Sequence, residues 1–218
     1  MTGSGRDAIS VGLSGGSGVV YGIRLVEVLL SEGRRVHLSC TDSALRVLRH
    51  EAGIDLDEAA PPLASLFDER LRDSLHVHDI GAVEAAPASG SAGILGTVVC
   101  PCSMGTLARI AHGFSSNLIE RAGDVALKEG RALVLVPRET PLSEVHLENM
   151  LKLRRMGATI LPAMPGFYHH PESVSDLVDF VVAKILDALG VESSIVKRWT
   201  TPDPTAESGG SVWDEGER

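Results

Sequence analysis

The feature that most constrains this chain is an alternation between short apolar runs rich in β-branched residues and longer stretches with helical amphipathic spacing. The runs that predict strands are residues 8–13, 35–40, 97–100, 132–136 and 159–161. The stretches that predict helices are residues 19–31, 104–112, 117–129, 143–156 and 173–189. Strands separated by helices long enough to serve as crossovers run parallel and are covered on both faces. The sequence therefore predicts a single α/β domain, a doubly wound parallel sheet with helices on both faces.

The length of the chain points to one domain followed by a tail. Its 218 residues, 44% of them hydrophobic, supply enough apolar material for one buried core. We expect this domain to span residues 1–199 and the polar, acidic segment 200–218 to be a disordered tail. Two segments, 52–65 and 81–96, break the alternation. The second is rich in glycine, serine and alanine, and a long loop of this kind inside a compact domain favours a functional role.

The charge balance and the cysteines narrow the function classes. A formal net charge of −9 argues against a nucleic-acid partner, because phosphate backbones bind clustered basic surfaces. No apolar run approaches the roughly 20 residues that cross a bilayer, and the N-terminus lacks the apolar core of a signal peptide, so we expect a cytoplasmic protein with no membrane partner. Cys100 and Cys102 are one residue closer than a zinc C-x-x-C pair, and we expect them, with Cys40, to be reduced core residues.

One stretch of the chain gathers cations in an otherwise acidic protein. Its members are Arg109, Arg121, Lys128, Arg131 and Arg138. Such a stretch indicates either a site for a small, highly charged anion or solvated charges on helix surfaces. The sequence motifs that follow the predicted strands help to decide between an anion site and solvated surface charges.

Two glycine-containing turns follow predicted strands. Residues 12–18 (GLSGGSG) permit close backbone approach and open a helix, which suits an anion, but they match neither the dinucleotide fingerprint nor the Gly-Lys-Ser/Thr phosphate loop. A mononucleotide phosphate site or a simple tight turn remains. After the third strand, Ser103 is placed to cap a helix, and Gly105 and Thr106 offer N–H and hydroxyl groups. Because ligands bind at the carboxyl ends of parallel strands, the two turns together favour a binding site.

Two further junctions carry reactive side chains. Arg138 offers a fork of donors suited to phosphate or a flavin carbonyl, and Glu139 is a carboxylate placed to exchange protons. Alone, the pair also fits a surface ion pair. Tyr168, in a proline-rich loop, presents a ring and a hydroxyl that suit covering a ligand and bonding its phosphate. His169 and His170 are adjacent in an extended loop and therefore diverge, which disfavours a metal site.

Several ordered blocks of the sequence resemble the UbiX-type flavin prenyltransferases. The blocks are residues 15–18, 87–91, 101–107, 117–122, 124–128, 133–139, 146–150 and 165–169, and the likeness runs in order from about Ile9 to Trp199. The resemblance implies a Rossmann-like, flavodoxin-like domain that binds FMN and assembles into a homo-oligomer, usually a dodecamer, with sites at subunit contacts. It implies a metal-independent prenyltransferase that transfers dimethylallyl from dimethylallyl phosphate to N5 and then C6 of reduced FMN. The resemblance further implies that the product, prenylated FMN, serves a UbiD-type decarboxylase.

Roles carry over from the family position by position. Residues expected to bind FMN are Gly15, Gly16, Ser17, Thr41, Ser103, Met104, Gly105, Thr106 and Arg138. Residues expected to surround the phosphate of the prenyl donor are Arg121, Lys128, Tyr168 and Lys184. Residues expected to take part in catalysis are Glu139 as the acid/base group, Ser17, Lys128 and Glu51. The chemistry is coherent, because cations and hydroxyls in a dry site help an allylic phosphate to ionise.

The chain departs from the family pattern at two places. Lys184 stands where the family usually has arginine, which keeps the charge, loses bidentate geometry and predicts weaker phosphate binding. Residues 80–86 contain no tryptophan, although some relatives have one there, and this changes the expected lining of the prenyl pocket.

Two alternative functions remain. One is an FMN-dependent decarboxylase of the homo-oligomeric cysteine-decarboxylase type, but its Pro-x-Met-Asn motif is replaced here by residues 101–104 (PCSM), and His50 is the nearest candidate for its catalytic histidine. The other is a non-catalytic flavin carrier. A carrier has no need of Lys128, Glu139, Tyr168 and Lys184 together, which favours the prenyltransferase.

Overall fold

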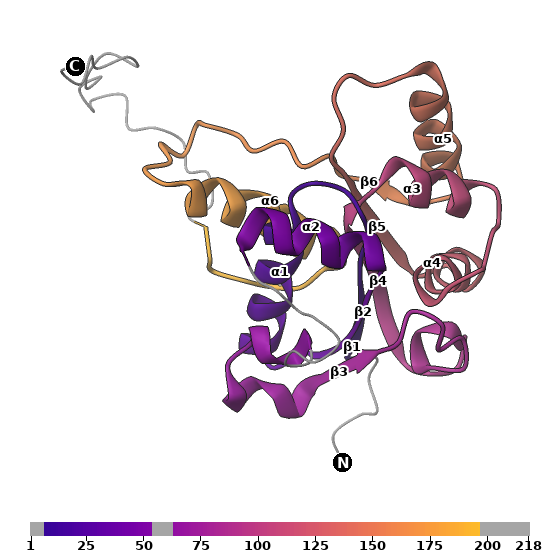
Figure 1. The fold of residues 1–218 in the computed structure, drawn as a ribbon, viewed down its shortest axis with the longest axis horizontal. Helices are drawn as coiled ribbons and strands as arrows, with labels where there is room; N and C mark the ends of the chain where they lie inside the picture. Colours follow the sequence, from indigo (N-terminus) through magenta and orange to yellow (C-terminus); the bar gives the residue numbers. More distant parts are fainter. Residues whose placement is uncertain (1–6, 54–62, 197–218) are drawn as a thin grey trace.

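A parallel sheet forms the middle layer of the molecule (Figure 1). The computed structural model describes residues 7–53 and 63–196, and the predicted tail at 200–218 lies outside the described residues. The strand order is β3-β2-β1-β4-β5-β6, and each neighbouring pair is parallel. The strands are β1 (Ala8–Leu13), β2 (Arg35–Cys40), β3 (Leu75–His78), β4 (Ile94–Cys102), β5 (Ala132–Pro137) and β6 (Thr159–Ile160). The doubly wound α/β fold predicted from the alternation is confirmed.

Helices cover both faces of this sheet (Figure 1). They are α1 (Val19–Ser31), α2 (Asp42–Ala52), α3 (Met104–Ala111), α4 (Leu118–Lys128), α5 (Glu144–Arg155) and α6 (Val174–Leu189). Strand β5 shows how the faces divide, because successive side chains of a strand point to opposite sides. Val134 and Val136 pack with residues of α1 and α6, whereas Leu133 and Leu135 pack with residues of α3, α4 and α5.

Local sequence signals fix where several helices begin. Asn117, Ser143 and Ser173 precede α4, α5 and α6, and each side chain accepts a hydrogen bond from the backbone N–H three residues later. Gly190 ends α6 with a left-handed backbone, φ 70°, which a residue with a Cβ adopts only with strain. The predicted helix positions are therefore confirmed to within a residue or two.

The described residues form six strands where five were predicted, and the α-helix α2 was not predicted. Strand β3 lies at the sheet edge with the sequence LHVH, and only Leu75 of its residues is buried, so it lacks an apolar run. Helix α2 buries only Ala44 and Leu48, which makes its apolar stripe too narrow to stand out. The loop expected over 81–96 ends earlier, because residues 94–96 already belong to β4.

The order of the strands places a topological switch between β1 and β4. From β1 the chain builds β2 and β3 on one side, and it then crosses to β4 on the other side. The carboxyl ends of β1 and β4 are thus adjacent, with their following turns diverging, which is where open α/β sheets bind ligands. None of the helices in the described part of the chain is both long and apolar enough to span a membrane.

Candidate functional site at the sheet switch point

A buried serine ties together the two turns at the switch point. The hydroxyl of Ser14, fully buried after β1, donates to the carbonyl oxygen of Pro101 at 3.0 Å. The same hydroxyl accepts from the backbone N–H of Ser103 at 2.8 Å. The backbone N–H of Ser14 also donates to the Pro101 oxygen at 3.1 Å. These bonds fix the turn at residues 14–18 against the turn at residues 103–106.

The glycines of the first turn allow a close approach of backbone to its neighbours. A Cβ added at Gly15 would lie 2.6 Å from Ser43 Cβ and Oγ, so residue 15 has to be glycine in this arrangement. A Cβ at Gly16 would face the second turn, 3.4 Å from Pro101 Cβ. At Gly105, by contrast, an added Cβ has open space on all sides. The exposed backbone at Gly105, next to the close packing around Gly15 and Gly16, suits a flat, phosphate-bearing ligand.

Glu51 occupies the N-terminus of helix α1. Its carboxylate accepts from the backbone N–H of Gly18 at 2.9 Å and from that of Val19 at 3.2 Å. Partial burial favours the neutral acid, but hydrogen bonds from the Ser17 side chain and these N–H groups, with the charge of Arg138, hold the pKa of Glu51 below its ordinary value. The anion at this helix end is therefore a protein side chain. The Gly16 N–H is also used within the turn, where it donates to the Ser14 carbonyl oxygen at 2.8 Å.

The second turn is organised by its own hydroxyl groups. Ser103 caps α3: its Oγ accepts from the N–H of Thr106 at 3.3 Å and donates to Thr106 Oγ1 at 3.1 Å. The Met104 side chain is buried in the core with α3, α4 and α5, which leaves its backbone as the part near the turn surface. Thr41, after β2, caps α2 through the N–H of Ala44 at 3.1 Å. All these predicted flavin contacts follow strands β1, β2 and β4 at the same sheet edge.

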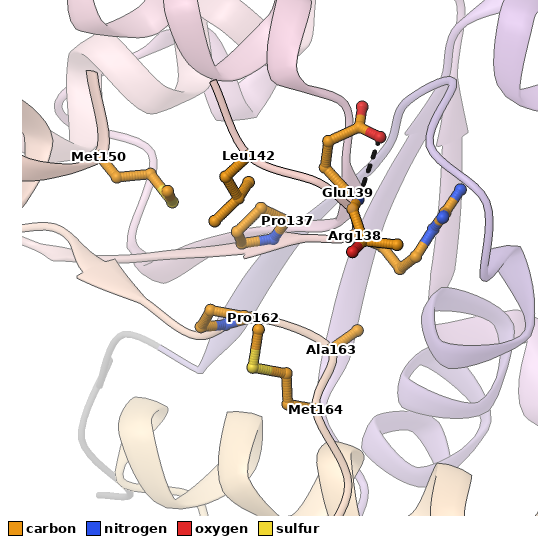
Figure 2. A pocket seen from close by; sticks show the side chains of 9 residues that line it. Pro137, Arg138, Glu139, Leu142, Met150, Pro162, Ala163 and Met164 are labelled. Carbon is orange, nitrogen blue, oxygen red and sulfur yellow. Dashed lines mark hydrogen bonds between the residues drawn. The ribbon is translucent and has the colours of Figure 1, made fainter. Parts of the chain in front are cut away.

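Arg138 and Glu139 follow β5 at that edge and point in different directions (Figure 2). Arg138 contributes a positive charge toward Glu51, and its buried Nε has no hydrogen-bond partner in the described part of the chain. An orphaned buried donor of this kind is expected where a ligand completes the site. Glu139 is exposed, and its Oε1 accepts from the Thr140 N–H at 3.2 Å.

A largely apolar pocket of about 190 Å³ lies beside Glu139 (Figure 2). It is lined by Pro137, Arg138, Glu139, Thr140, Leu142, Met150, Pro162, Ala163 and Met164. The loop that closes it is held to the end of β5 by the Ala163 N–H, which donates to the Pro137 oxygen at 3.0 Å. An apolar wall next to a carboxylate and a guanidinium suits an uncharged hydrocarbon group carried on an anion.

The four residues expected around the donor phosphate do not come together within one chain. Arg121 and Lys128 lie on α4, which packs on the face shared with α3 and α5. Lys184 lies on α6, on the opposite face with α1, and Tyr168 packs against Phe180 of that same helix. Lys128 pairs with its neighbour Glu129 at 3.3 Å, and the buried Nε of Arg121 has no partner among the described residues. The sheet separates the two pairs.

The cysteines behave as core residues. Cys100 and Cys102 are fully buried, Cys40 is partly buried, and all three thiols are free. Burial raises the pKa of Cys40 to about 12 and raises those of Cys100 and Cys102 further. The prediction of reduced core cysteines is confirmed for Cys100 and Cys102, and Cys40 lies at the edge of the core. Within the described ranges, no group of three or more histidine, cysteine or carboxylate side chains is arranged to hold a metal ion.

Sequence reasoning missed Ser14 and the capping role of Glu51. Ser14 stands beside the glycines of a motif that the sequence analysis singled out, and its position directly after a buried strand was the available signal. Nothing in the sequence shows that Glu51, 33 residues from Gly18, reaches the end of α1. That contact depends on how α2 packs against α1, which periodicity does not reveal.

A parallel sheet with glycine and hydroxyl-rich turns at its switch point defines a mononucleotide-binding α/β protein, and the family model described as Flavoprotein matches residues 2–186. Two curated relatives, both named flavin prenyltransferase UbiX, are more specific. The one from Alkalihalophilus pseudofirmus is 51% identical over 191 residues, covering 88% of this chain and 95% of the relative. The one from Pseudomonas aeruginosa is 48% identical over 199 residues, covering 90% and 95%. The chain belongs to the UbiX flavin prenyltransferase family.

Solved structures give the same result. AnUbiX (PadA1), in complex with FMN and dimethylallyl pyrophosphate, is 38% identical and superposes with a TM-score of 0.79 over 91% of this chain and all of that one. A dodecameric FMN-dependent UbiX-like decarboxylase from Escherichia coli O157:H7 is 40% identical, with a TM-score of 0.78 over 89% of this chain and all of that one. The cysteine decarboxylase TvaF, at 19% identity and a TM-score of 0.55, shares only the fold.

Proposed function

We propose that this chain is a flavin prenyltransferase that transfers dimethylallyl from dimethylallyl phosphate to N5 and then C6 of reduced FMN, without a metal. The observation that carries the proposal is the likeness, over nearly the whole chain, to UbiX enzymes and to a structure that holds FMN with a dimethylallyl ester. The product, prenylated FMN, is expected to serve a UbiD-type decarboxylase.

The switch-point turns fit FMN as the acceptor substrate. Gly105 offers exposed backbone, and Ser103 and Thr106 offer hydroxyl groups beside it. Arg138 brings a buried Nε that lacks a partner in the described residues, together with a positive charge that suits the flavin ring carbonyls or phosphate. Gly15, Ser17, Thr41 and Met104 complete the set of residues that we assign to FMN.

The phosphate of the prenyl donor is bound between subunits in this proposal. Arg121 and Lys128 lie across the sheet from Tyr168 and Lys184, so one chain cannot close all four around one phosphate. A homo-oligomer, with α4 of one subunit beside the Tyr168 loop of another, removes this difficulty. The dodecameric state of the relative from Escherichia coli O157:H7 supports a dodecamer here.

The catalytic roles follow from the charges at the site. As the C–O bond of the donor breaks, its electron pair leaves with the phosphate, and the cations Arg121, Lys128 and Lys184 neutralise the developing charge. Glu139, exposed beside the apolar pocket, is assigned to accept the proton lost from C6 when the new ring closes. Glu51 and Ser17 share a hydrogen bond at the start of α1 and are assigned to proton exchange near the flavin.

The oligomer part of the proposal has a direct test by complementation. Lys128→Met and Lys184→Met chains, each inactive alone, are produced separately and together in one cell. If the two lysines of a site come from different subunits, mixed oligomers contain some sites with both lysines intact, and activity returns. If both come from one chain, every mixed site keeps a defect, and the absence of activity contradicts the proposal.

The competing function is an FMN-dependent decarboxylase. The relative from Escherichia coli O157:H7 is itself described as a decarboxylase, which makes this alternative specific. We test the two by incubating the protein anaerobically with dimethylallyl phosphate and measuring released phosphate with and without reduced FMN. Release that depends on reduced FMN supports the transferase. No release, together with carbon dioxide from a peptide ending in cysteine, favours the decarboxylase.

The cytoplasmic location stays a prediction.

A further inference from the structure

One aromatic ring touches both substrate-facing groups on the α6 side of the molecule. Phe180, on α6, is only 9% exposed. The ring of Tyr168 meets it edge-on, with centroids 5.5 Å apart and an angle of 79° between the planes. The Nζ of Lys184 lies 5.8 Å from the centroid of the same ring. Phe180 is thus shared by the two residues of this face that are assigned to the donor phosphate.

The local sequence explains why these groups meet. Phe180 and Lys184 are four residues apart on α6 and therefore lie on the same side of the helix. A Cβ added at Gly166 would lie 3.0 Å from ring atoms of both Phe180 and Tyr168. Because glycine has no side chain, the backbone at this position can pack close to both rings. The ring of His169 stacks on Phe180 at 5.2 Å, with 11° between the planes. Phe180 is the centre of this cluster.

The contacts matter because Tyr168 and Lys184 are otherwise exposed. Each is 51% exposed, and long exposed side chains lose conformational freedom when they are fixed on a ligand. The nearest carboxylate, Asp187, lies 4.0 Å from Lys184 Nζ and competes for it. The negative face of an aromatic ring attracts an ammonium group, and an edge-to-face pair restrains the second ring. Phe180 therefore limits both side chains before any ligand arrives.

We propose that Phe180 is a positioning residue for the donor phosphate, because it holds the Tyr168 ring and the Lys184 ammonium group on one aromatic surface. The inference rests on the proposed function and deepens it, since it names what orders half of the phosphate site. The Phe180 ring also restrains the ammonium group of Lys184. A lysine lacks the planar fork of arginine, and a ring that fixes its ammonium group offsets part of that loss.

The test compares two phenylalanines of the same hydrophobic core. Phe180→Leu removes the ring and keeps an apolar side chain of similar size. Phe67→Leu makes the same change at a residue that is 3% exposed, in the same core cluster but without these contacts. For both variants we measure KM for dimethylallyl phosphate, kcat, the Kd for FMN and Tm. We expect Phe180→Leu to raise KM about three- to tenfold with little change in FMN affinity. The Phe67→Leu variant is expected to lower Tm and leave KM unchanged.

A double-mutant cycle separates positioning from general loosening. If Phe180 acts through its partners, Phe180→Leu adds little to the Kd for dimethylallyl phosphate, measured by direct binding, in a chain that already carries Lys184→Met and Tyr168→Phe. A full additional loss in that background overturns the inference. So does a wild-type KM in Phe180→Leu, or an equal rise of KM in Phe67→Leu. If the wild-type chain itself neither transfers the prenyl group nor binds inorganic phosphate, the proposed function has failed, and the inference falls with it.

Discussion

The carboxylate of Glu51 accepts hydrogen bonds from the backbone N–H groups of Gly18 and Val19, at 2.9 and 3.2 Å. A side chain of α2 thereby satisfies the first orphan donors of α1 and places a negative charge at the positive end of that helix. The flavin site that we propose lies beside a helix end that already holds an anion. The hydrogen bonds that hold the first turn in place therefore depend on Glu51 being ionised.

Glu51→Gln removes this charge and keeps one acceptor oxygen. The pKa of Glu51 is lowered in the folded chain, so its ionised form contributes stability above the ordinary carboxyl pKa, and that contribution is lost as pH falls through the folded value. The variant is expected to unfold with a weaker dependence on pH in the acid range and to show slower prenyl transfer at neutral pH. Urea unfolding at several pH values checks the first point. An unchanged acid slope contradicts the role of Glu51 as an ionised cap.

Ser14→Ala tests the bridge between the two turns. The substitution leaves the partly buried Ser103 N–H without its acceptor and removes the bond from buried Ser14 to Pro101, and we expect a loss of about 1–3 kcal/mol in the free energy of unfolding. Because the turns no longer hold each other, FMN is also expected to bind more weakly. Ser31→Ala is the control, since that hydroxyl is exposed and bonds only within α1. Equal losses in the two variants contradict a special role for Ser14.

Glu139→Gln tests the acid/base assignment. Glu139 is exposed, and its Oε1 accepts only from the adjacent Thr140 N–H in the described structure, so the amide should leave the fold intact. We expect the variant to bind FMN normally and to turn over roughly 10²- to 10⁴-fold more slowly, the range for a removed general base. Flavin titration and single-turnover kinetics provide the two readouts. Turnover at the wild-type rate rules out Glu139 as the proton acceptor.

His37 makes a prediction about acid stability that is independent of catalysis. It stacks between His76 and His78, with centroids 5.0 and 5.1 Å away, and its Nδ1 lies 2.8 Å from His78 Nε2. Burial, then the charges of His78, His76 and Arg35, lower the pKa of His37 to about 4. Between this value and the ordinary histidine pKa of about 6.5, the unfolded chain binds a proton that the folded chain does not, so stability falls as pH falls.

His37→Gln should therefore reduce the slope of unfolding free energy against pH in that window. The reduction has an upper limit of about 1.4 kcal/mol per pH unit, which corresponds to one proton. The exposed His50→Gln serves as the control for a histidine outside the cluster. If the two variants change the slope equally, the claim that the histidine cluster lowers the pKa of His37 is contradicted.

Periodic patterns were enough to predict the layers of this fold, and contacts between distant residues were not visible in them. The continuous apolar run at residues 132–136 predicts a strand buried on both faces, and its neighbours Leu133 and Val134 are both buried, on opposite faces. The edge strand β3 escaped because it carries histidines where an apolar run was sought. An edge strand needs less burial than a central one, so its sequence carries a weaker signal.

In the candidate site, too, local features were predictable from the sequence and long-range contacts were not. Its turns were predictable, since glycine and serine directly after a strand indicate a backbone open to a ligand. The bond from Ser103 to Ser14 spans 89 residues, and Phe180 is a plain helix residue until the loop of Tyr168 folds onto it. The separation of Arg121 from Lys184 by the sheet was likewise invisible in a linear motif.

The most direct test of the central claim is mass spectrometry of the flavin extracted after the protein is incubated anaerobically with reduced FMN and dimethylallyl phosphate. The account predicts a flavin heavier by one isoprene unit, formed by the wild-type chain and far more slowly by Glu139→Gln. Unmodified FMN, recovered from a protein that binds it well, would contradict the account and leave the decarboxylase or the flavin carrier in its place.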